Sequence, residues 1–453
     1  MTGPSTTKAA RPSRGDELEL TVDSLAHGGN GVARLDGYVV FVAGAVPGDR
    51  VRAVVGKAKR AYAEARAVEV LEPSPDRVPP VAHHPGAPWQ VLPYERQLAV
   101  KATQVREALE RIGKLRDFEL EPIVPAVQEW RYRNKLEFSF GRGPDDELVC
   151  GFHAPGRWDE IVPMDDCLLA SERSNAVREQ VLAWARAHDL PPWDRREQRG
   201  LLRNLVVREG RRTGELQVRL VTSPGSIDAD SLIDAVDCDS LFWTRQEQLG
   251  ESTSGGETVL LSGAPQLRER LGGLEFLISP EAFFQTNTEM AEQLYEAAAD
   301  MAQLRGYERV FDLFSGIGTI GLALAPRARE VVGVEIVEAA VADAIENARR
   351  NDVLNARFFA GDIRLAMRDL LEEAGRPDVL VVDPPRAGLS QKVVRRILEA
   401  QPSRVVYVSC NPTTLAPNAA QMVDAGYRLT RVRPVDMFPQ TPHIETVALL
   451  ERD

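Results

Sequence analysis

The sequence has few cysteines and no long apolar run. Its four cysteines, Cys150, Cys167, Cys238 and Cys410, form no CxxC pair and no disulfide framework, which indicates a reducing compartment. No stretch reaches the roughly 20 apolar residues that a membrane span needs. The first residues, MTGPSTTKAARPSRG, lack the apolar segment of a secretory signal. We therefore expect a cytoplasmic protein with no membrane partner.

Positive charge is also in short supply. The formal net charge is −12, which argues against a broad surface that coats nucleic acid. It does not exclude a protein that contacts nucleic acid through a local basic patch. The 453 residues are enough for two to four domains, each with its own core.

The N-terminal part predicts a small all-β domain. Residues 1–15 are small, polar and basic and indicate a disordered tail, whereas 16–75 contain short valine-rich runs separated by glycine turns. One predicted strand of this region carries basic residues and an aromatic: Arg50, Arg52, Lys57, Lys59, Arg60, Tyr62 and Arg66. This pattern is typical of an oligonucleotide-binding barrel. A solvated basic face on a generic barrel explains the segment equally well.

The middle of the chain predicts a linker followed by a mixed α+β domain. Residues 76–93 are proline-rich, and a helix is expected at about Tyr94–Ile112. We assign 94–275 to this central domain, which we expect to bind RNA if the protein acts on RNA. Its arginines cluster, and for most of them we expect exposed positions on strands: Arg131, Arg133, Arg203, Arg208, Arg211, Arg212 and Arg219.

The C-terminal part, 276–453, predicts a doubly wound α/β domain. Apolar runs of four to six residues, such as VFDLF, VVGVEI and RVVYVSC, alternate with helical segments. Such runs fit strands that are buried on both faces and joined by crossover helices. The expected fold class is therefore α/β, with a Rossmann-like C-terminal domain, an N-terminal barrel and a mixed central domain.

Glycines after the first strand of this domain predict a cofactor site. Gly316 and Gly318 let the backbone pass close to a ligand at the carboxyl end of the sheet. Glu335 ends the second strand, where an acidic residue binds a ribose diol. NAD and S-adenosylmethionine both satisfy this pattern, although the turn lacks the third glycine of the dinucleotide motif. Asp362 follows the third strand and would bind an adenine or simply cap a helix.

The end of the fourth strand favours methyl transfer over hydride transfer. Asp383 precedes two prolines there, in the segment Asp-Pro-Pro-Arg. The prolines stiffen the backbone, and the carboxylate faces the ligand edge of the sheet. A Pro-Pro pair alone would only end a strand.

Cys410 is the candidate nucleophile. It follows the apolar strand RVVYVS and precedes Asn411-Pro412, which marks a helix start. The partial positive charge of a helix N-terminus is expected to lower the thiol pKa. A thiolate that adds to carbon 6 of uracil makes carbon 5 nucleophilic towards a methyl donor. The other three cysteines are expected to be packing residues.

This chemistry also needs a base for the proton on carbon 5. Glu445 opens the last apolar strand after a turn-rich segment that contains His443. A strand-edge glutamate could equally be a solvated surface residue. Its position and the neighbouring His443 favour the catalytic interpretation.

Taken together, these motifs resemble the RNA uracil-5-methyltransferase family. SPEAFFQTN, DLFSGIGT, GVE, DPPRAGL, SCNP and HIET occur in the order typical of that family. The N-terminal barrel resembles the TRAM domain that precedes many of its members. The resemblance covers nearly the whole chain.

The resemblance implies roles for individual residues. Contacts to S-adenosylmethionine would be made by Gln285, Phe314, Thr319, Glu335 and Asp383, with Asp362 as a further candidate. Cys410 would be the nucleophile and Glu445 the base, acting on a flipped-out uridine. The segment near the RNA would include Arg131, Arg133 and Asn134. We expect a monomer whose partner is RNA.

One departure from the family concerns metal. Many relatives hold a [4Fe–4S] cluster with four cysteines, and Cys167 resembles a remaining fourth ligand. Trp89, Gln90, Tyr94 and Gln97 keep the surrounding pattern, but no cysteine occurs there. His83 and His84 with one cysteine are a poor ligand set. We predict no cluster and no metal site.

Several alternatives stay open. The barrel favours 23S ribosomal RNA as the substrate over transfer RNA, whose enzymes often lack it. A cytosine-5-methyltransferase would use a different nucleophile motif, and an amino-methylating enzyme would carry an aromatic residue in place of Arg386. A non-catalytic RNA-binding or ribosome-assembly factor on the same fold is disfavoured because Cys410 and Glu445 are present.

Overall fold

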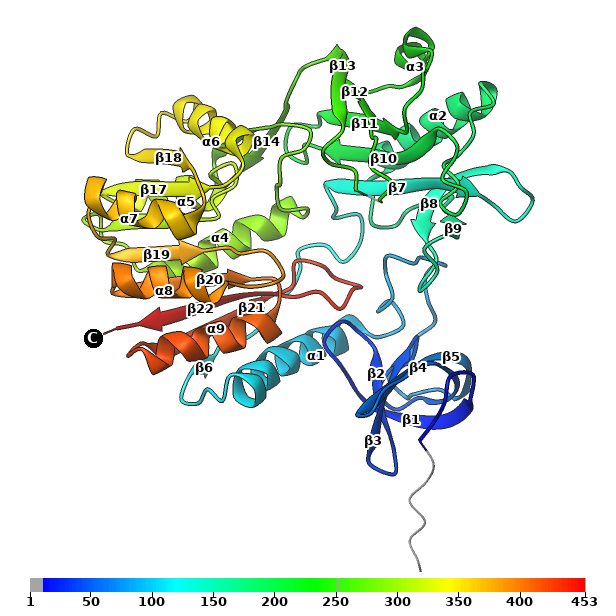
Figure 1. Ribbon diagram of the computed structural model, residues 1–453, viewed down its shortest axis with the longest axis horizontal. Coiled ribbons are helices and arrows are strands. Elements are labelled where there is room, and N and C mark those ends of the chain that lie inside the picture. The colour runs from blue at the N-terminus through cyan, green and yellow to red at the C-terminus, as the bar shows by residue number, and fades with distance from the viewer. Residues whose placement is uncertain (1–10, 251, 453) are drawn as a thin grey trace, which may run out of the picture. The chain divides into compact units, whose positions relative to one another are not determined.

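The computed structural model describes residues 11–250 and 252–452 (Figure 1). The chain forms two compact units. The first unit holds the described residues up to His83, with Ala87–Glu107 and Phe438–His443. The second holds His84–Gly86, Ala108–Met437 and the described residues from Ile444 onward. Most of the predicted tail at 1–15 lies outside the described residues. Among those described, no helix has the length and apolar character that a membrane crossing requires.

The first unit contains a closed barrel. Its strands follow the order β1–β2–β3–β5–β4. Their bounds are β1 (Glu17–Leu25), β2 (Gly31–Leu35), β3 (Tyr38–Ala43), β4 (Arg50–Ala58) and β5 (Tyr62–Glu72). The predicted all-β barrel is therefore confirmed.

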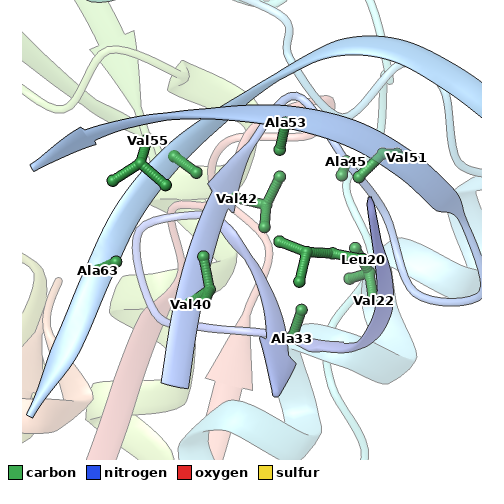
Figure 2. Close-up of a cluster of buried hydrophobic side chains, with 11 residues drawn as sticks. Leu20, Val22, Ala33, Val40, Val42, Ala45, Val51, Ala53, Val55 and Ala63 are labelled. Carbon is green, nitrogen blue, oxygen red and sulfur yellow. The ribbon is translucent and has the colours of Figure 1, made fainter. Parts of the chain in front are cut away.

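Small aliphatic side chains fill the barrel, as Figure 2 shows. Along β4, buried Val51, Ala53 and Val55 alternate with more exposed neighbours. This period of two places every second side chain inside the barrel. Valine and alanine suit the narrow interior of a five-stranded barrel, where larger side chains would collide.

The basic residues of the barrel lie on two strands, so the prediction of one strand from Arg50 to Arg66 is wrong. A turn at 59–61 separates β4 from β5. Glutamates neutralise several of these cations: Arg50 contacts Glu19 and Glu72, Arg52 contacts Glu69, and Lys57 contacts Glu64. Exposed pairs of this kind add little stability. They make the basic face smaller than the sequence suggests.

Asp49 joins the start of β4 to the chain that follows β5. Its buried carboxylate accepts hydrogen bonds from the backbone N–H groups of Val46 (2.8 Å) and Ser74 (2.9 Å). Arg77 donates to it through Nε and Nη2, at 3.0 and 2.6 Å. Burial alone would raise the pKa of Asp49, but the bonds from Arg77, Val46 and Ser74 hold this pKa below its usual value. The carboxylate therefore stays ionised inside the unit.

Replacing Asp49 tests this connection. Asp49→Ala should cost the first unit about 3 kcal/mol, because it leaves a guanidinium and two N–H groups unpaired. Hydrogen exchange of the barrel strands should then speed up by about a hundredfold. Asp23→Ala, at an exposed position of the same barrel, is the control and should change little. Unchanged exchange in Asp49→Ala would contradict the assignment.

The segment after the barrel is irregular but anchored. Between β5 and α1 (Tyr94–Glu107), the described chain has no helix or strand. Buried Gln97 on α1 donates from Nε2 to Trp89 O (3.0 Å), Leu92 O (3.0 Å) and Gln440 Oε1 (2.8 Å). The predicted helix Tyr94–Ile112 is confirmed, except that its end, Ala108–Ile112, is π-helical and belongs to the second unit.

The second unit contains a central sheet. Within the described residues its strand order is β13–β12–β11–β10–β7–β8–β9. The bounds are β7 (Lys135–Arg142), β8 (Leu148–His153), β9 (Ile161–Pro163), β10 (Leu202–Glu209), β11 (Leu216–Thr222), β12 (Ser240–Arg245) and β13 (Glu257–Gly263). Helices α2 (Glu172–Ala187) and α3 (Ala229–Ala235) pack on this sheet. A hairpin of β14 (Leu267–Leu271) and β15 (Leu274–Ile278) follows.

A larger sheet of mainly parallel strands completes the second unit. Its order is β18–β17–β16–β19–β20–β22–β21–β6 (Figure 1). The bounds are β16 (Arg309–Leu313), β17 (Glu330–Glu335), β18 (Ala356–Ala360), β19 (Val379–Val382), β20 (Arg404–Ser409), β21 (Arg428–Val435), β22 (Glu445–Glu451) and β6 (Glu119–Leu120). The edge strand β6 comes from the segment that the sequence assigned to the central domain.

Helices connect the strands of this sheet. They are α4 (Thr288–Ala302), α5 (Thr319–Leu324) with a 3-10 turn at Ala325–Arg327, α6 (Glu338–Arg350), α7 (Ile363–Glu373), α8 (Gln391–Ala400) and α9 (Pro412–Asp424). Consecutive residues of β19 and β20 are buried, so both faces of the sheet are covered. The strand β16 lies between β17 and β19. The direction of winding therefore reverses there, and ligands bind beside such a point, at the carboxyl ends of the strands.

Candidate active site at the carboxyl ends of the strands

The turn after β16 has an unusual backbone. Phe314, Gly316 and Gly318 all have positive φ, at 64°, 54° and 84°. For Phe314 this conformation is strained, and strain of this kind concentrates at functional sites. A Cβ at Gly318 would lie 2.9 Å from the Phe358 ring, so only glycine fits there. Thr319 begins α5 and accepts a hydrogen bond from the Tyr295 hydroxyl at 3.0 Å.

Glu335 holds this turn in place. Its carboxylate accepts from Gly316 N at 3.1 Å, and from the backbone N–H groups of Ile336 (2.8 Å) and Val337 (3.0 Å). The end of β17 and the glycine turn therefore form one rigid edge. The half-buried carboxylate lies beside the turn, as the sequence predicted.

A cavity of about 240 Å³ opens beside this edge. Phe314, Ile336, Asp362 and Pro385 are among its lining residues, and Ile336 is 65% exposed. Asp362 caps α7 by accepting from Arg364 N at 2.9 Å, which confirms the capping alternative, and it also lines the cavity. Gln285, Thr319 and Glu335 are not among the described lining residues.

Gln285 lies on a loop that the central sheet holds. The buried Asn134 side chain donates to Gln285 O at 2.8 Å and to Thr288 Oγ1 at 2.9 Å. Asn134 N also donates to Thr286 O at 2.8 Å. Asn134 is only 3% exposed and positions this loop, while the expected nearness of its segment to the RNA stays a prediction. Arg131 is more exposed and pairs with Asp166.

Two buried arginines of the central sheet bind the same loop. Arg208 donates to Ser279 O (3.2 Å) and Ala282 O (2.7 Å), and Arg219 contacts Glu281 at 3.2 Å. Burial lowers the pKa of Arg208 to about 10, and it lowers the pKa of Arg219 as well. These cations are buried among polar partners, and their hydrogen bonds fix residues 279–282.

The prediction that most of the clustered arginines are exposed is therefore wrong for Arg203, Arg208 and Arg219. Each is at most 3% exposed. For Arg208 and Arg219 the physical reason is that one face of the central sheet is polar and lies under other segments of the second unit. Arg203 is buried by a different contact, because it donates to Gln246 O and Gln248 O. The sequence does contain a pattern that indicates this polar face. Polar residues fall on alternate positions of both strands, and the strand register brings them to one face: Asn204 and Arg208 on β10, and Gln217 and Arg219 on β11.

Loss of the hydrogen bonds from Arg208 should make the loop that carries Gln285 more mobile. Arg208→Ala leaves the carbonyls of Ser279 and Ala282 without their donor, so hydrogen exchange across 280–287 should rise by about tenfold. Exchange in the barrel strands should stay unchanged. The control is Arg270→Ala, whose side chain is 66% exposed. Equal protection of 280–287 in both variants would show that Arg208 does not position the loop.

Cys410 and Glu445 meet across two antiparallel strands. Ser409 on β20 pairs with Thr446 on β22, so Cys410 and Glu445 occupy the next opposed positions. Cys410 is half-buried, and Glu445 is 3% exposed. Among the described residues, Glu445 Oε2 has no hydrogen-bond partner. A buried carboxylate oxygen without a partner is costly and is typical of a ligand site.

The electrostatics of Cys410 differ from the expectation. Burial, followed by the charges of Glu445 and Asp383, raises the pKa of the Cys410 thiol to about 11. The prediction that the helix N-terminus lowers this pKa is therefore wrong for the free protein. Arg386 opposes the shift but does not outweigh it. The thiol is protonated at neutral pH.

Burial acts on the neighbouring acids in the same direction. It raises the pKa of Asp383 to about 7, and it raises that of Glu445 well above its usual range, with a further contribution from Asp383. It also raises the pKa of Asp312, at the end of β16, to about 7. A cluster of buried acids that repel one another favours a ligand with positive charge.

Cys167 has a different partner. Its buried Sγ lies 3.3 Å from Nε2 of buried His84. No group of three or more His, Cys, Asp or Glu residues that could hold a metal occurs in the described part of the chain. One thiol and one imidazole do not fit a cluster that needs four ligands. The absence of a cluster remains a prediction.

Two family profiles match the chain. The tRNA (uracil-5-)-methyltransferase profile matches residues 272–453, and the TRAM-domain profile matches residues 12–68. A protein of Halalkalibacterium halodurans, named an uncharacterized RNA methyltransferase, is 39% identical over 97% of this chain and 98% of its own. A similarly named protein of Gloeobacter violaceus is 38% identical over 97% of each chain.

The chain belongs to the RNA uracil-5-methyltransferase family. A solved structure extends the similarity to three dimensions: the tRNA (uracil-54, C5)-methyltransferase of Pyrococcus abyssi, in complex with S-adenosyl-L-homocysteine. It is 30% identical, with a TM-score of 0.80, over 95% of this chain and 99% of the other. The predicted family, fold class and enzyme class are confirmed. The roles of single residues in this methyltransferase remain predictions.

Proposed function

We propose that this methyltransferase transfers a methyl group from S-adenosylmethionine to carbon 5 of a uridine in RNA, with Cys410 as nucleophile and Glu445 as base. The observation that carries the proposal is the opposed position of these two side chains, at the sheet edge that also bears the glycine turn. A non-catalytic role for the fold would require neither residue.

The residues of the site fit the cofactor. The molecule carries a sulfonium and an ammonium cation, and the buried acids Asp312, Asp383 and Glu445 form a site that favours positive charge. The strained turn at Phe314, which Glu335 holds in place, lies at the carboxyl ends of the strands. Nucleosides bind at this edge of a doubly wound sheet. The bound cofactor supplies an electrophilic methyl group.

The proposed reaction balances from the thiolate form of Cys410, whose proton passes to solvent before the attack. The thiolate of Cys410 bonds to carbon 6, and the electrons of the carbon 5–carbon 6 double bond move towards the oxygen on carbon 4. Carbon 5 then takes the methyl group, and the sulfonium becomes a neutral thioether. Glu445 removes the proton from carbon 5, the double bond re-forms, and the thiolate of Cys410 leaves.

The pKa shifts match these roles. The Cys410 thiol must lose its proton before it attacks, and its pKa of about 11 means that a bound cation or Arg386 has to stabilise the thiolate. The raised pKa of Glu445 makes its carboxylate a stronger base than a solvated glutamate.

Two RNAs are candidate substrates. We retain 23S ribosomal RNA as the first, because the chain carries the N-terminal barrel. Transfer RNA is the second, favoured by the Pyrococcus abyssi enzyme, which acts on transfer RNA and matches this chain over 95% of its length, barrel included. Mass-spectrometric mapping of 5-methyluridine in both RNAs, with and without the gene, separates the two.

Substitutions at the two catalytic positions test the mechanism. Cys410→Ala should lower methylation by about a thousandfold or more, while binding of S-adenosylmethionine stays within about twofold. Cys238→Ala removes a different half-buried thiol and is the matched control, with normal activity expected. Glu445→Gln should stop turnover after the methyl transfer, so that a covalent RNA–protein complex accumulates. Normal turnover of either Cys410→Ala or Glu445→Gln would refute its assigned role.

Cofactor binding should depend on pH. The pKa of Asp383 is about 7 in the free protein because of burial, so below pH 7 a cation must displace its proton. Affinity for S-adenosylmethionine should therefore rise up to about tenfold per pH unit as the pH approaches 7, and level off above about pH 8. Calorimetry from pH 5.5 to 8.5 measures this. Asp383→Asn should bind weakly with a flatter profile, and a pH-independent wild type would contradict the account.

A further inference from the structure

A second groove adjoins the cavity beside Phe314. It lies between the first turn of α7 and the first two turns of α8, and has a volume of about 250 Å³. The two helices pack against each other. Its lining residues are Asp362, Arg364, Leu365, Lys392, Arg395 and Arg396. None of the proposed catalytic steps uses these cations.

Positive charge predominates in this α7–α8 groove. Four cations line it and only one carboxylate does, that of Asp362, which pairs with Arg364. Glu399, further along α8, contacts Arg395 at 3.8 Å and Arg396 at 2.5 Å. In a chain with a net charge of −12, such a local excess of cations marks a contact for an anion.

The helix backbone adds to the positive electrostatic potential of the groove. Asp362 caps α7 and lines the groove, so this helix begins at the groove, whereas Ser390, the cap of α8, lines the neighbouring cavity. The N-terminus of a helix carries partial positive charge and N–H groups that are not bonded within the helix. Arg396 Nε donates to Arg364 O at 3.1 Å and ties the second turn of α8 to the first turn of α7. The cations are thus presented from a fixed frame.

The groove lies next to the cavity of the candidate active site. Asp362 and Arg364 line both the groove and the cavity beside Phe314. A polymer that delivers a base to Cys410 therefore has a charged surface within reach on the same edge of the sheet. Leu365 is 74% exposed in the groove and offers an apolar contact. Phosphates combined with apolar sugar faces match such a lining better than an acidic peptide does.

We propose that the α7–α8 groove binds the sugar–phosphate backbone of the RNA substrate at nucleotides flanking the target uridine. This inference rests on the proposed function and adds a contact surface to it. Lys392 and Arg395 are exposed, with the Arg395 side chain 66% exposed, and Arg364 is exposed too but pairs with Asp362. Arg364 and Arg396 shape the groove as well as contributing charge.

The test measures RNA affinity against salt. The probe is a fluorescein-labelled 17-nucleotide RNA stem-loop with uridines in its loop. Lys392→Ala/Arg395→Ala should weaken binding by about tenfold at 100 mM salt and reduce the slope of log K against log salt by about 2. The control, Arg327→Ala/Arg329→Ala, removes the same charge at the opposite edge, where β17 begins, and should bind like wild type.

The outcomes separate this inference from the proposed function. If wild type binds and methylates RNA and the groove variant binds it with the same affinity and slope, the groove is not an RNA contact and the inference is overturned. If the groove variant loses binding of polyglutamate but keeps that of RNA, an acidic protein is the partner and the inference is again overturned. If wild type neither binds nor methylates RNA, the proposed function itself fails. Calorimetry with S-adenosylmethionine confirms that each variant is folded.

Discussion

The antiparallel pairing of β20 with β22 determines the chemistry of this methyltransferase. The other neighbours in the core of the sheet run parallel, so their side chains meet at one edge only through the loops that follow the strands. Here the end of one strand meets the beginning of another, and Cys410 is brought directly opposite Glu445. The proposed nucleophile and the proposed base, more than 30 positions apart in the sequence, are thereby held at the paired ends of β20 and β22.

Burial then gives this pair its properties. Burial raises the pKa of Cys410, Glu445 and Asp383, so each favours its protonated form, and the charge of Asp383 adds to the shift of the other two. Such a site is poorly suited to a free thiolate and well suited to a cationic methyl donor. The loop that carries Gln285 is kept in place from the central sheet by Asn134 and Arg208. The central sheet therefore supports the candidate active site.

The sequence predicted the strand-end motifs correctly because glycine turns and polar residues after apolar runs are local signals. It predicted the barrel and the α/β domain for the same reason. It did not predict the burial of Arg208 and Arg219, because that depends on which segment covers the central sheet. The direction of the Cys410 pKa shift was also missed, since a helix N-terminus is visible in the sequence but the burial of the thiol, which is the main cause of the shift, is not. The edge strand β6 is too short to carry a pattern.

The central claim is that Cys410 bonds to carbon 6 of the target uridine. RNA that contains 5-fluorouridine tests it most directly, because fluorine cannot leave carbon 5 as a proton does. Incubation with S-adenosylmethionine should give a stable complex whose mass is that of protein, RNA and one methyl group. Peptide mapping should place the link at Cys410. The absence of a complex with an RNA that the enzyme methylates, or a link at another residue, would contradict the account.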